Sequence, residues 1–283
     1  MNDSPANVDG KLVEALRRDG FVIQRGALRA SSMRTLLAEF REVFRRQMRR
    51  HGIPGAEAEG EAFDAALADL FRADMKSYLA AAKLTQYLPS VHALGAEGPV
   101  LDLVRELGIA HPAIAVRPVV HVISDDLKVP GGYHRTPHHQ DWRSVQGSLD
   151  GLVVWLPLVD IEYGFNAIEV IPGSHRRGLL ATTPHPFGTA VLDDLIDESE
   201  YVPVEVRPGD VVAFSMFTVH RTGPADRPGV RWAVSLRYNN IDEASFIDHD
   251  YPNPFLYKSQ DDLLFEDFPA PADIAQALGD EEE

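Results

Sequence analysis

The chain has 283 residues, a formal net charge of -16, 45% hydrophobic and 25% charged residues, and no cysteine. This length and composition are typical of a globular protein with a substantial core. The lack of cysteine excludes disulfides, iron–sulfur clusters, thiolate zinc sites and cysteine nucleophiles, so any metal must be held by His, Asp or Glu. Such ligands suit harder divalent ions such as Fe(II) and Mn(II).

The negative charge argues against nucleic-acid binding, because a phosphate backbone would be repelled. No apolar run is long enough to span a membrane, and the polar start of the chain lacks the basic and apolar regions of a signal peptide. We therefore expect a cytoplasmic protein without a nucleic-acid or membrane partner, and either a monomer or a homodimer. The acidic residues 193–200 and 280–283 are expected to be a solvated loop and tail.

The first hundred residues are predicted to be mainly helical. A short helix is expected before Gly20, followed by a strand over residues 21–23. A longer helix capped by Ser31 or Ser32 would carry on one face Met33, Leu36, Leu37, Phe40, Phe44 and Met48. A second amphipathic helix would carry Phe63, Leu67, Leu70, Phe71, Met75 and Tyr78. A shorter helix is expected from residue 100 to residue 107.

Beyond residue 112, short β-branched and aromatic runs alternate with turns rich in Gly and Pro. The expected strands span residues 113–123, 152–158, 167–171, 202–206, 211–214 and 232–239. Many short strands separated by turn signals favour a sandwich or barrel over βαβ units, with the helices packed outside one sheet. We expect one domain over residues 1–283, with a helical support at about 10–110, a β core at about 112–240 and a peripheral C-terminal tail.

The sequence His139-Gln140-Asp141 is a candidate metal-binding segment. Residues two apart on a strand point to the same face, so His139 and Asp141 can converge on one ion. His220 is the natural third ligand. Two histidines and a carboxylate occupy one face of a metal and leave positions open for a cosubstrate and O₂. The spacing of His139 and Asp141 alone is equally typical of a hydrogen-bonded pair.

Arg231 begins the apolar segment 232–236. A buried guanidinium there could hold the distal carboxylate of a dicarboxylate cosubstrate through paired hydrogen bonds. Thr222, two residues after His220, could add a hydroxyl. Taken alone, Arg231 also fits a surface arginine at the start of a strand.

Several segments in order carry a resemblance to a known family. They are Asp19-Gly20-Phe21-Val22, His139-Gln140-Asp141, Trp155-Leu156-Pro157-Leu158, Asn166-Ala167-Ile168-Glu169-Val170-Ile171-Pro172-Gly173-Ser174-His175, Pro208-Gly209-Asp210, His220 and Arg231. Together they resemble the phytanoyl-CoA dioxygenase (PhyH) family of Fe(II)/2-oxoglutarate-dependent oxygenases, over about residues 10 to 240. The resemblance implies a double-stranded β-helix (a cupin-like jelly roll) with the N-terminal helices packed on one sheet.

The resemblance also implies roles for individual residues. The family's iron ligands match His139, Asp141 and His220, which would form the catalytic centre. Residues that hold or approach 2-oxoglutarate in relatives match Arg231, Thr222, Gln140 and Trp155. His175 belongs to a run that is usually structural. Relatives often have Asn-Gly and a small or apolar residue before that run, whereas this chain has Gly164-Phe165-Asn166-Ala167, a departure in a turn and not in the metal site.

The implied cofactors are Fe(II), 2-oxoglutarate and O₂, and the implied reaction oxidises a C–H bond of a small molecule with release of succinate and CO₂. The intact Asp141 favours hydroxylation, because halogenating relatives have a small residue there. Candidate substrate contacts near the cavity mouth are Tyr133, Arg135, Trp142, Arg143 and Arg237. Two alternatives remain open at this point: a cupin-like dioxygenase or isomerase that does not use 2-oxoglutarate, and a non-catalytic jelly-roll binding protein.

Overall fold

A computed structural model describes residues 10–96, 98–129, 135–186, 188–253 and 268–279. The helices are α1 (Gly10–Asp19), α2 (Ala30–Arg50), α3 (Gly60–Ala73), α4 (Met75–Thr85), α5 (Pro89–Ala96), α6 (Gly98–Glu106), α7 (Trp142–Val145), α8 (Ala244–Asp248) and α10 (Pro271–Leu278). The strands are β1 (Phe21–Gln24), β2 (Pro112–Ile123), β3 (Leu152–Pro157), β4 (Ile168–Val170), β5 (Thr182–His185), β6 (Gly188–Val191), β7 (Val202–Val204), β8 (Val211–Ser215), β9 (His220–Thr222) and β10 (Arg231–Asn240).

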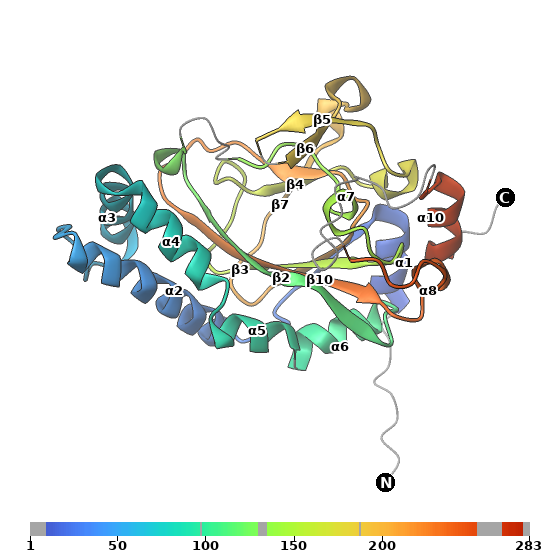
Figure 1. Cartoon of the computed structure of the whole chain (residues 1–283), viewed down its shortest axis with the longest axis horizontal. Helices are drawn as coiled ribbons and strands as arrows, with labels where there is room; N and C mark the ends of the chain where they lie inside the picture. Colours follow the sequence, from blue (N-terminus) through green and yellow to red (C-terminus); the bar gives the residue numbers. More distant parts are fainter. Residues whose placement is uncertain (1–9, 97, 130–134, 187, 254–267, 280–283) are drawn as a thin grey trace, which may run out of the picture.

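Two antiparallel sheets form the β core. The larger has the strand order β1-β8-β3-β10-β2, and the smaller has the order β7-β4-β9. Helices α2 to α6 lie along the outer side of the larger sheet (Figure 1). The strands β5 and β6 form a separate hairpin. This arrangement confirms the expected all-β core with helices packed on one sheet.

Alternation along the central strands separates two cores. Successive side chains of a strand point to opposite faces of the sheet. In β3, Val154 and Leu156 pack into the core under the helices, whereas Val153 and Trp155 pack into the core between the sheets. The same alternation in β10 sends Trp232 and its even-numbered neighbours toward the helices. The odd-numbered polar residues of β10 therefore face the space between the sheets: Arg231, Ser235 and Arg237.

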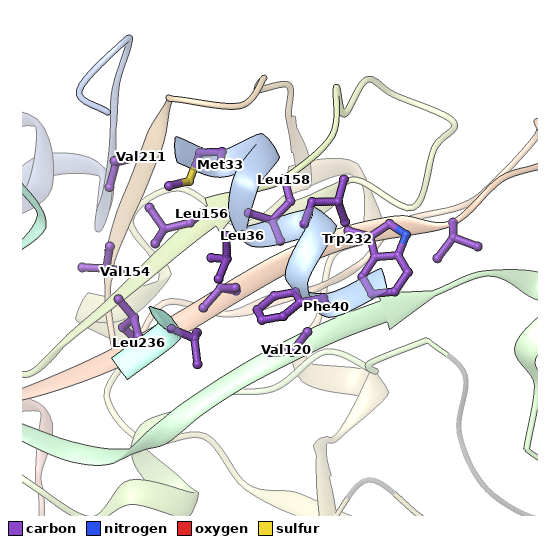
Figure 2. Packing of buried hydrophobic residues seen from close by; sticks show 14 of the residues in the cluster. Met33, Leu36, Phe40, Val120, Val154, Leu156, Leu158, Val211, Trp232 and Leu236 are labelled. Carbon is purple, nitrogen blue, oxygen red and sulfur yellow. The ribbon is translucent and has the colours of Figure 1, made fainter. Parts of the chain in front are cut away.

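Helix α2 supplies the centre of the outer core. Its apolar stripe matches the predicted helix, and Figure 2 shows Met33, Leu36 and Phe40 in one cluster with the sheet residues Leu156 and Trp232. The helix begins one residue before the expected caps, because the residue in the cap position is Arg29 rather than Ser31 or Ser32. The hydrophobic stripe, and not a side-chain cap, determines where this helix lies.

Other expectations were wrong in detail. The second predicted helix is two helices, because Asp74 leaves the helical conformation after α3 and accepts a hydrogen bond from the Ser77 N–H at the start of α4. The β5–β6 hairpin was not predicted, because its two short segments lack apolar alternation. The C-terminal segment was expected to be peripheral, yet α10 buries Ile274 and packs against the 3₁₀ turn Ser174–Arg177.

Replacing Phe40 with alanine tests the outer core. Phe40 is fully buried between α2 and the large sheet, so Phe40→Ala should lower the free energy of unfolding by about 3–5 kcal/mol. Leu84→Ala is the matched control, because Leu84 is 55% exposed and its loss should cost within about 0.5 kcal/mol. Urea unfolding measures both variants. Equal destabilisation by the two changes would contradict this account of the core.

Candidate active site

His139 and His220 lie opposite each other on adjacent backbone segments. The N–H of His139 donates to the His220 carbonyl at 3.0 Å, and the reverse bond measures 3.1 Å. Each Nδ1 lies within hydrogen-bond distance of the carbonyl two residues earlier, at 2.8 Å for Pro137 and 2.9 Å for Thr218. Because a carbonyl can only accept, both Nδ1 atoms carry the proton and each Nε2 presents the lone pair through which an imidazole binds a metal.

Asp141 completes the cluster from a turn. The expectation that His139 and Asp141 share a strand was wrong, because Asp141 has helical backbone angles and occupies the position before α7. The turn nevertheless brings Asp141 Oδ1 to 3.6 Å from His139 Nε2. The candidate ligand atoms of His139, Asp141 and His220 all lie within 4.8 Å of one another, and the three residues are buried. One ion can therefore contact all three.

The protonation states of this cluster suit a divalent cation. Burial and the neighbouring His139 lower the pKa of His220 to about 3, so its imidazole is neutral at pH 7. Burial opposes the ionisation of Asp141, but the adjacent Arg237 and the two imidazoles outweigh it and hold the pKa of Asp141 well below its usual range. Metal binding requires deprotonated ligands, and His220 and Asp141 are in that form at neutral pH.

Arg231 is a buried cation on the inner face of β10. Only 2% of the residue is exposed, and its guanidinium lies over the Trp155 ring at 5.6 Å. Nη1 donates to the Asn166 carbonyl at 2.7 Å, whereas Nε has no hydrogen-bond partner. Among the described residues no carboxylate forms an ion pair with it, and burial lowers its pKa to about 9. A buried charge without a counter-ion is costly, so this position is suited to an anionic ligand.

The candidate ligands and Arg231 line one cavity of about 570 Å³ between the sheets. This volume is in the range of small-molecule sites. The wall residues near the cluster include Thr136, Ser144, Val153, Trp155, Ile168, Phe214 and Thr222. A larger, more open depression of about 830 Å³ lies between α2 and the turn at Pro208. None of the candidate ligands lines that depression, so volume alone does not locate the site.

The remaining candidate residues divide into two groups. Trp155 and Thr222 line the cavity together with Arg231. Gln140 does not: its amide donates to the carbonyls of Gly178 and Phe217 and accepts from the Leu180 N–H. This full use of the amide favours a structural role, in which Gln140 holds neighbouring loops beside the cluster.

The predicted substrate contacts are mostly engaged elsewhere. Trp142 donates to the Gly147 carbonyl and stacks on Phe217, Arg143 donates to the Leu180 carbonyl, and Arg135 pairs with Asp125. None of these three lines the cavity, because their side chains leave the turn away from it. Tyr133 lies outside the described residues. Arg237 does line the cavity, but its guanidinium is paired with Asp141 and does not stand free at the mouth.

Two cavity residues were missed from the sequence. His121 lies in the middle of β2, and its Nε2 is 2.9 Å from the Ser235 hydroxyl of β10. Both residues lie in largely apolar segments, which the sequence predicts only as buried strands. Counting alternate positions from Arg231 would have placed Ser235 on the inner face. The position of His121 could not be found in this way, because it follows from the pairing of β2 with β10, in which His121 lies opposite Ala233.

Comparison with known proteins now identifies the family. Residues 16–231 match the family model described as phytanoyl-CoA dioxygenase (PhyH). The chain belongs to the phytanoyl-CoA dioxygenase family. It is therefore a non-haem iron and 2-oxoglutarate-dependent oxygenase, which confirms the predicted enzyme class and its cofactors Fe(II), 2-oxoglutarate and O₂. Membership decides against the cupin-like enzyme without 2-oxoglutarate and the non-catalytic alternative.

Solved structures show the same fold as this family member. The epimerase SnoN in complex with Fe3+, alpha ketoglutarate and nogalamycin RO has a TM-score of 0.57 and 21% identity, covering 84% of this chain and 85% of SnoN. The apo non-heme monooxygenase ThoJ has a TM-score of 0.56 and 19% identity, covering 81% and 77%. The apoform of EctD from S. alaskensis has a TM-score of 0.53 and 17% identity, covering 86% and 80%. These likenesses confirm the jelly roll.

No curated protein matches the sequence of this PhyH-family chain. In the part of the chain that the structure describes, no helix combines the length and the apolar character that crossing a bilayer requires.

The neutral state of buried His220 should make metal-free protein acid-sensitive. The folded pKa of His220 is about 3 and the unfolded value is about 6.5, so only the unfolded state binds this proton between those values. Stability should therefore fall as pH drops below about 6.5, by at most about 1.4 kcal/mol per pH unit from this residue. Urea unfolding of chelator-treated protein from pH 8 to pH 4 measures it.

His220→Gln should flatten that slope, and both proteins should show the same slope between pH 7 and pH 8, where His220 does not titrate. An unchanged slope between pH 6 and pH 4 in the variant would contradict the assignment.

Proposed function

We propose that this chain binds Fe(II) through His139, Asp141 and His220, holds 2-oxoglutarate between that ion and Arg231, and hydroxylates a C–H bond of a small molecule. The observation that carries the proposal is the buried guanidinium of Arg231, which has no ion-pair partner in the described chain and lines the same cavity as the ligand cluster. Two imidazoles and a carboxylate form the donor set that suits Fe(II) in such oxygenases.

The residues around Arg231 fit a dicarboxylate. A carboxylate beside the guanidinium would supply the missing counter-charge and a partner for the free Nε. The Thr222 hydroxyl lines the same wall, and the Trp155 ring covers one face of the guanidinium. When bound, iron and 2-oxoglutarate supply the oxidising chemistry, in which O₂ is used and succinate and CO₂ are released.

The chain contributes orientation and shielding. The Pro137 and Thr218 carbonyls fix the two imidazole rings so that both Nε2 atoms are directed into the cavity. Val153, Ile168 and Phe214 form apolar wall beside the cluster, which limits the access of water to the reacting centre. The carboxylate of Asp141 leaves no vacant ligand position for a halide, which supports hydroxylation.

The substrate is proposed to be a small molecule with an apolar part. Part of the cavity is lined by Tyr78, Leu79 and Ala82 of α4 and by Leu127 and Val129. These side chains offer van der Waals surface and no charge, so they favour a hydrocarbon portion. The position of oxidation is set by which carbon such a wall holds next to the metal cluster.

Loss of Arg231 should weaken 2-oxoglutarate binding. Arg231→Gln removes the buried counter-charge of the distal carboxylate, which should cost about 2 kcal/mol or more, or roughly a 30-fold rise in Kd. The measurement is an anaerobic titration of Fe(II)-loaded protein with 2-oxoglutarate, followed by the visible charge-transfer band of the chelated keto acid. The band should also be lost in His139→Ala.

The matched control is Arg227→Gln, because Arg227 lies near Arg231 in sequence but is 46% exposed and pairs with Glu162. Its Kd for 2-oxoglutarate should change less than twofold. Equal affinity in wild type and Arg231→Gln would contradict the proposed cosubstrate site. With the site established, succinate release in the presence of candidate small molecules would identify the substrate.

A further inference from the structure

The guanidinium of Arg237 meets the Asp141 carboxylate in an unusual position. Nε donates to Oδ2 at 3.1 Å, and Nη2 lies 3.1 Å from Oδ2 and 3.2 Å from Oδ1. The two Nη2 distances are nearly equal, so this nitrogen lies between the two carboxylate oxygens. Both residues are buried at the cavity wall, where the side chain of Arg237 is 11% exposed and that of Asp141 is 3% exposed.

Arg237 Nη2 occupies the position that a metal ion bound by both Asp141 oxygens would take. A carboxylate binds metal ions through one oxygen or through both, and in the second case the ion lies between the oxygens. Nη2 and its positive charge exclude an ion from this space. Oδ2 accepts from Nε and lies 3.1 Å from Nη2, whereas Oδ1 accepts from Nη2 and lies 3.6 Å from His139 Nε2, on the side of the cluster.

A hydrogen-bonded brace holds Arg237 in place. Its Nη1 donates to the Ser235 hydroxyl at 3.1 Å, and that hydroxyl lies 2.9 Å from His121 Nε2. The hydroxyl can accept from Arg237 and at the same time donate its own proton to His121. Burial lowers the pKa of His121 well below its ordinary value, which keeps the imidazole neutral and able to accept. The guanidinium is therefore fixed from both β10 and β2.

We propose that Arg237 is a positioning residue that fills the space between the Asp141 oxygens and restricts Asp141 to ligation through Oδ1 alone. The proposal rests on the proposed function. An ion that these residues would hold through two imidazoles and one carboxylate oxygen would keep positions open for 2-oxoglutarate and O₂. An aspartate bound through both oxygens would fill one of those positions, so Arg237 keeps it open.

Nitric oxide is the probe that tests this inference, because it binds Fe(II) where O₂ would bind and gives an electron paramagnetic resonance signal without turnover. Anaerobic Fe(II)-loaded protein with saturating 2-oxoglutarate is titrated with nitric oxide. Arg237→Gln cannot reach between the oxygens as the guanidinium does, so its nitric oxide affinity should be at least tenfold weaker than that of wild type. Arg237→Met, which has no donor at all, should behave in the same way.

The matched control is Arg117→Gln. Arg117 lines the same cavity but contacts none of the candidate ligands, so the nitric oxide affinity should stay within twofold of wild type. Crystal structures of the Mn(II) and 2-oxoglutarate complexes give a direct second measurement. One Asp141 oxygen should lie within bonding distance of Mn(II) in wild type, and both should do so in the Arg237 variants.

The outcomes separate this inference from the proposed function. If wild type shows no charge-transfer band with 2-oxoglutarate, the proposed function itself fails. If wild type and the folded Arg237 variants show that band and bind nitric oxide equally, the role of Arg237 is wrong while the function stands. Loss of Fe(II) binding in both folded variants would also overturn the inference, because Arg237 would then be needed for the metal and not for its ligation mode.

Discussion

The backbone pairing of His139 with His220 is the contact on which the active site depends. It joins the segment before α7 to the smaller sheet and places two imidazoles side by side, with ring centroids 4.1 Å apart. The neighbouring bond from the Thr222 N–H to the Thr136 carbonyl extends the same pairing. The rings are then oriented by carbonyls of their own segments, so the cluster is built largely from main-chain geometry and needs few specialised side chains.

Two buried arginines on the inner face of β10 show how one strand serves two purposes. Arg237 has a resident carboxylate in Asp141, so its charge is compensated and its position is fixed. Among the described residues, Arg231 contacts the Asn166 carbonyl and the Trp155 ring but no carboxylate, which leaves its charge for a ligand. Burying a cation without a partner costs stability, and such a cost is typical of a site that a ligand completes. Arg237 therefore positions Asp141, whereas Arg231 is available to bind a ligand.

The fold and the cluster were largely predictable, whereas the surroundings of the cluster were not. The ordered set of family-like segments indicated His139, Asp141, His220 and Arg231, although each of these residues alone is a weak signal. The pairing of Arg237 with Asp141 could not be read, because it depends on the turn that puts Asp141 outside a strand. Gln140 was misjudged for a related reason: its neighbours in space come from distant loops. The pattern of residues within one segment predicts which face of a strand each side chain occupies. Contacts between two segments can be predicted only when the register of their pairing is known.

The strand β2 lies at the edge of the larger sheet, and the cavity reaches past it to α4. Residues on this helix line part of the cavity, yet none of them belongs to the metal cluster. Changes in Leu79 or Ala82 can therefore alter which molecules fit while the oxidising centre is preserved. A helix outside the β core can in this way change which compounds are oxidised while the metal-binding residues stay the same. These variable positions lie in the N-terminal half of the chain.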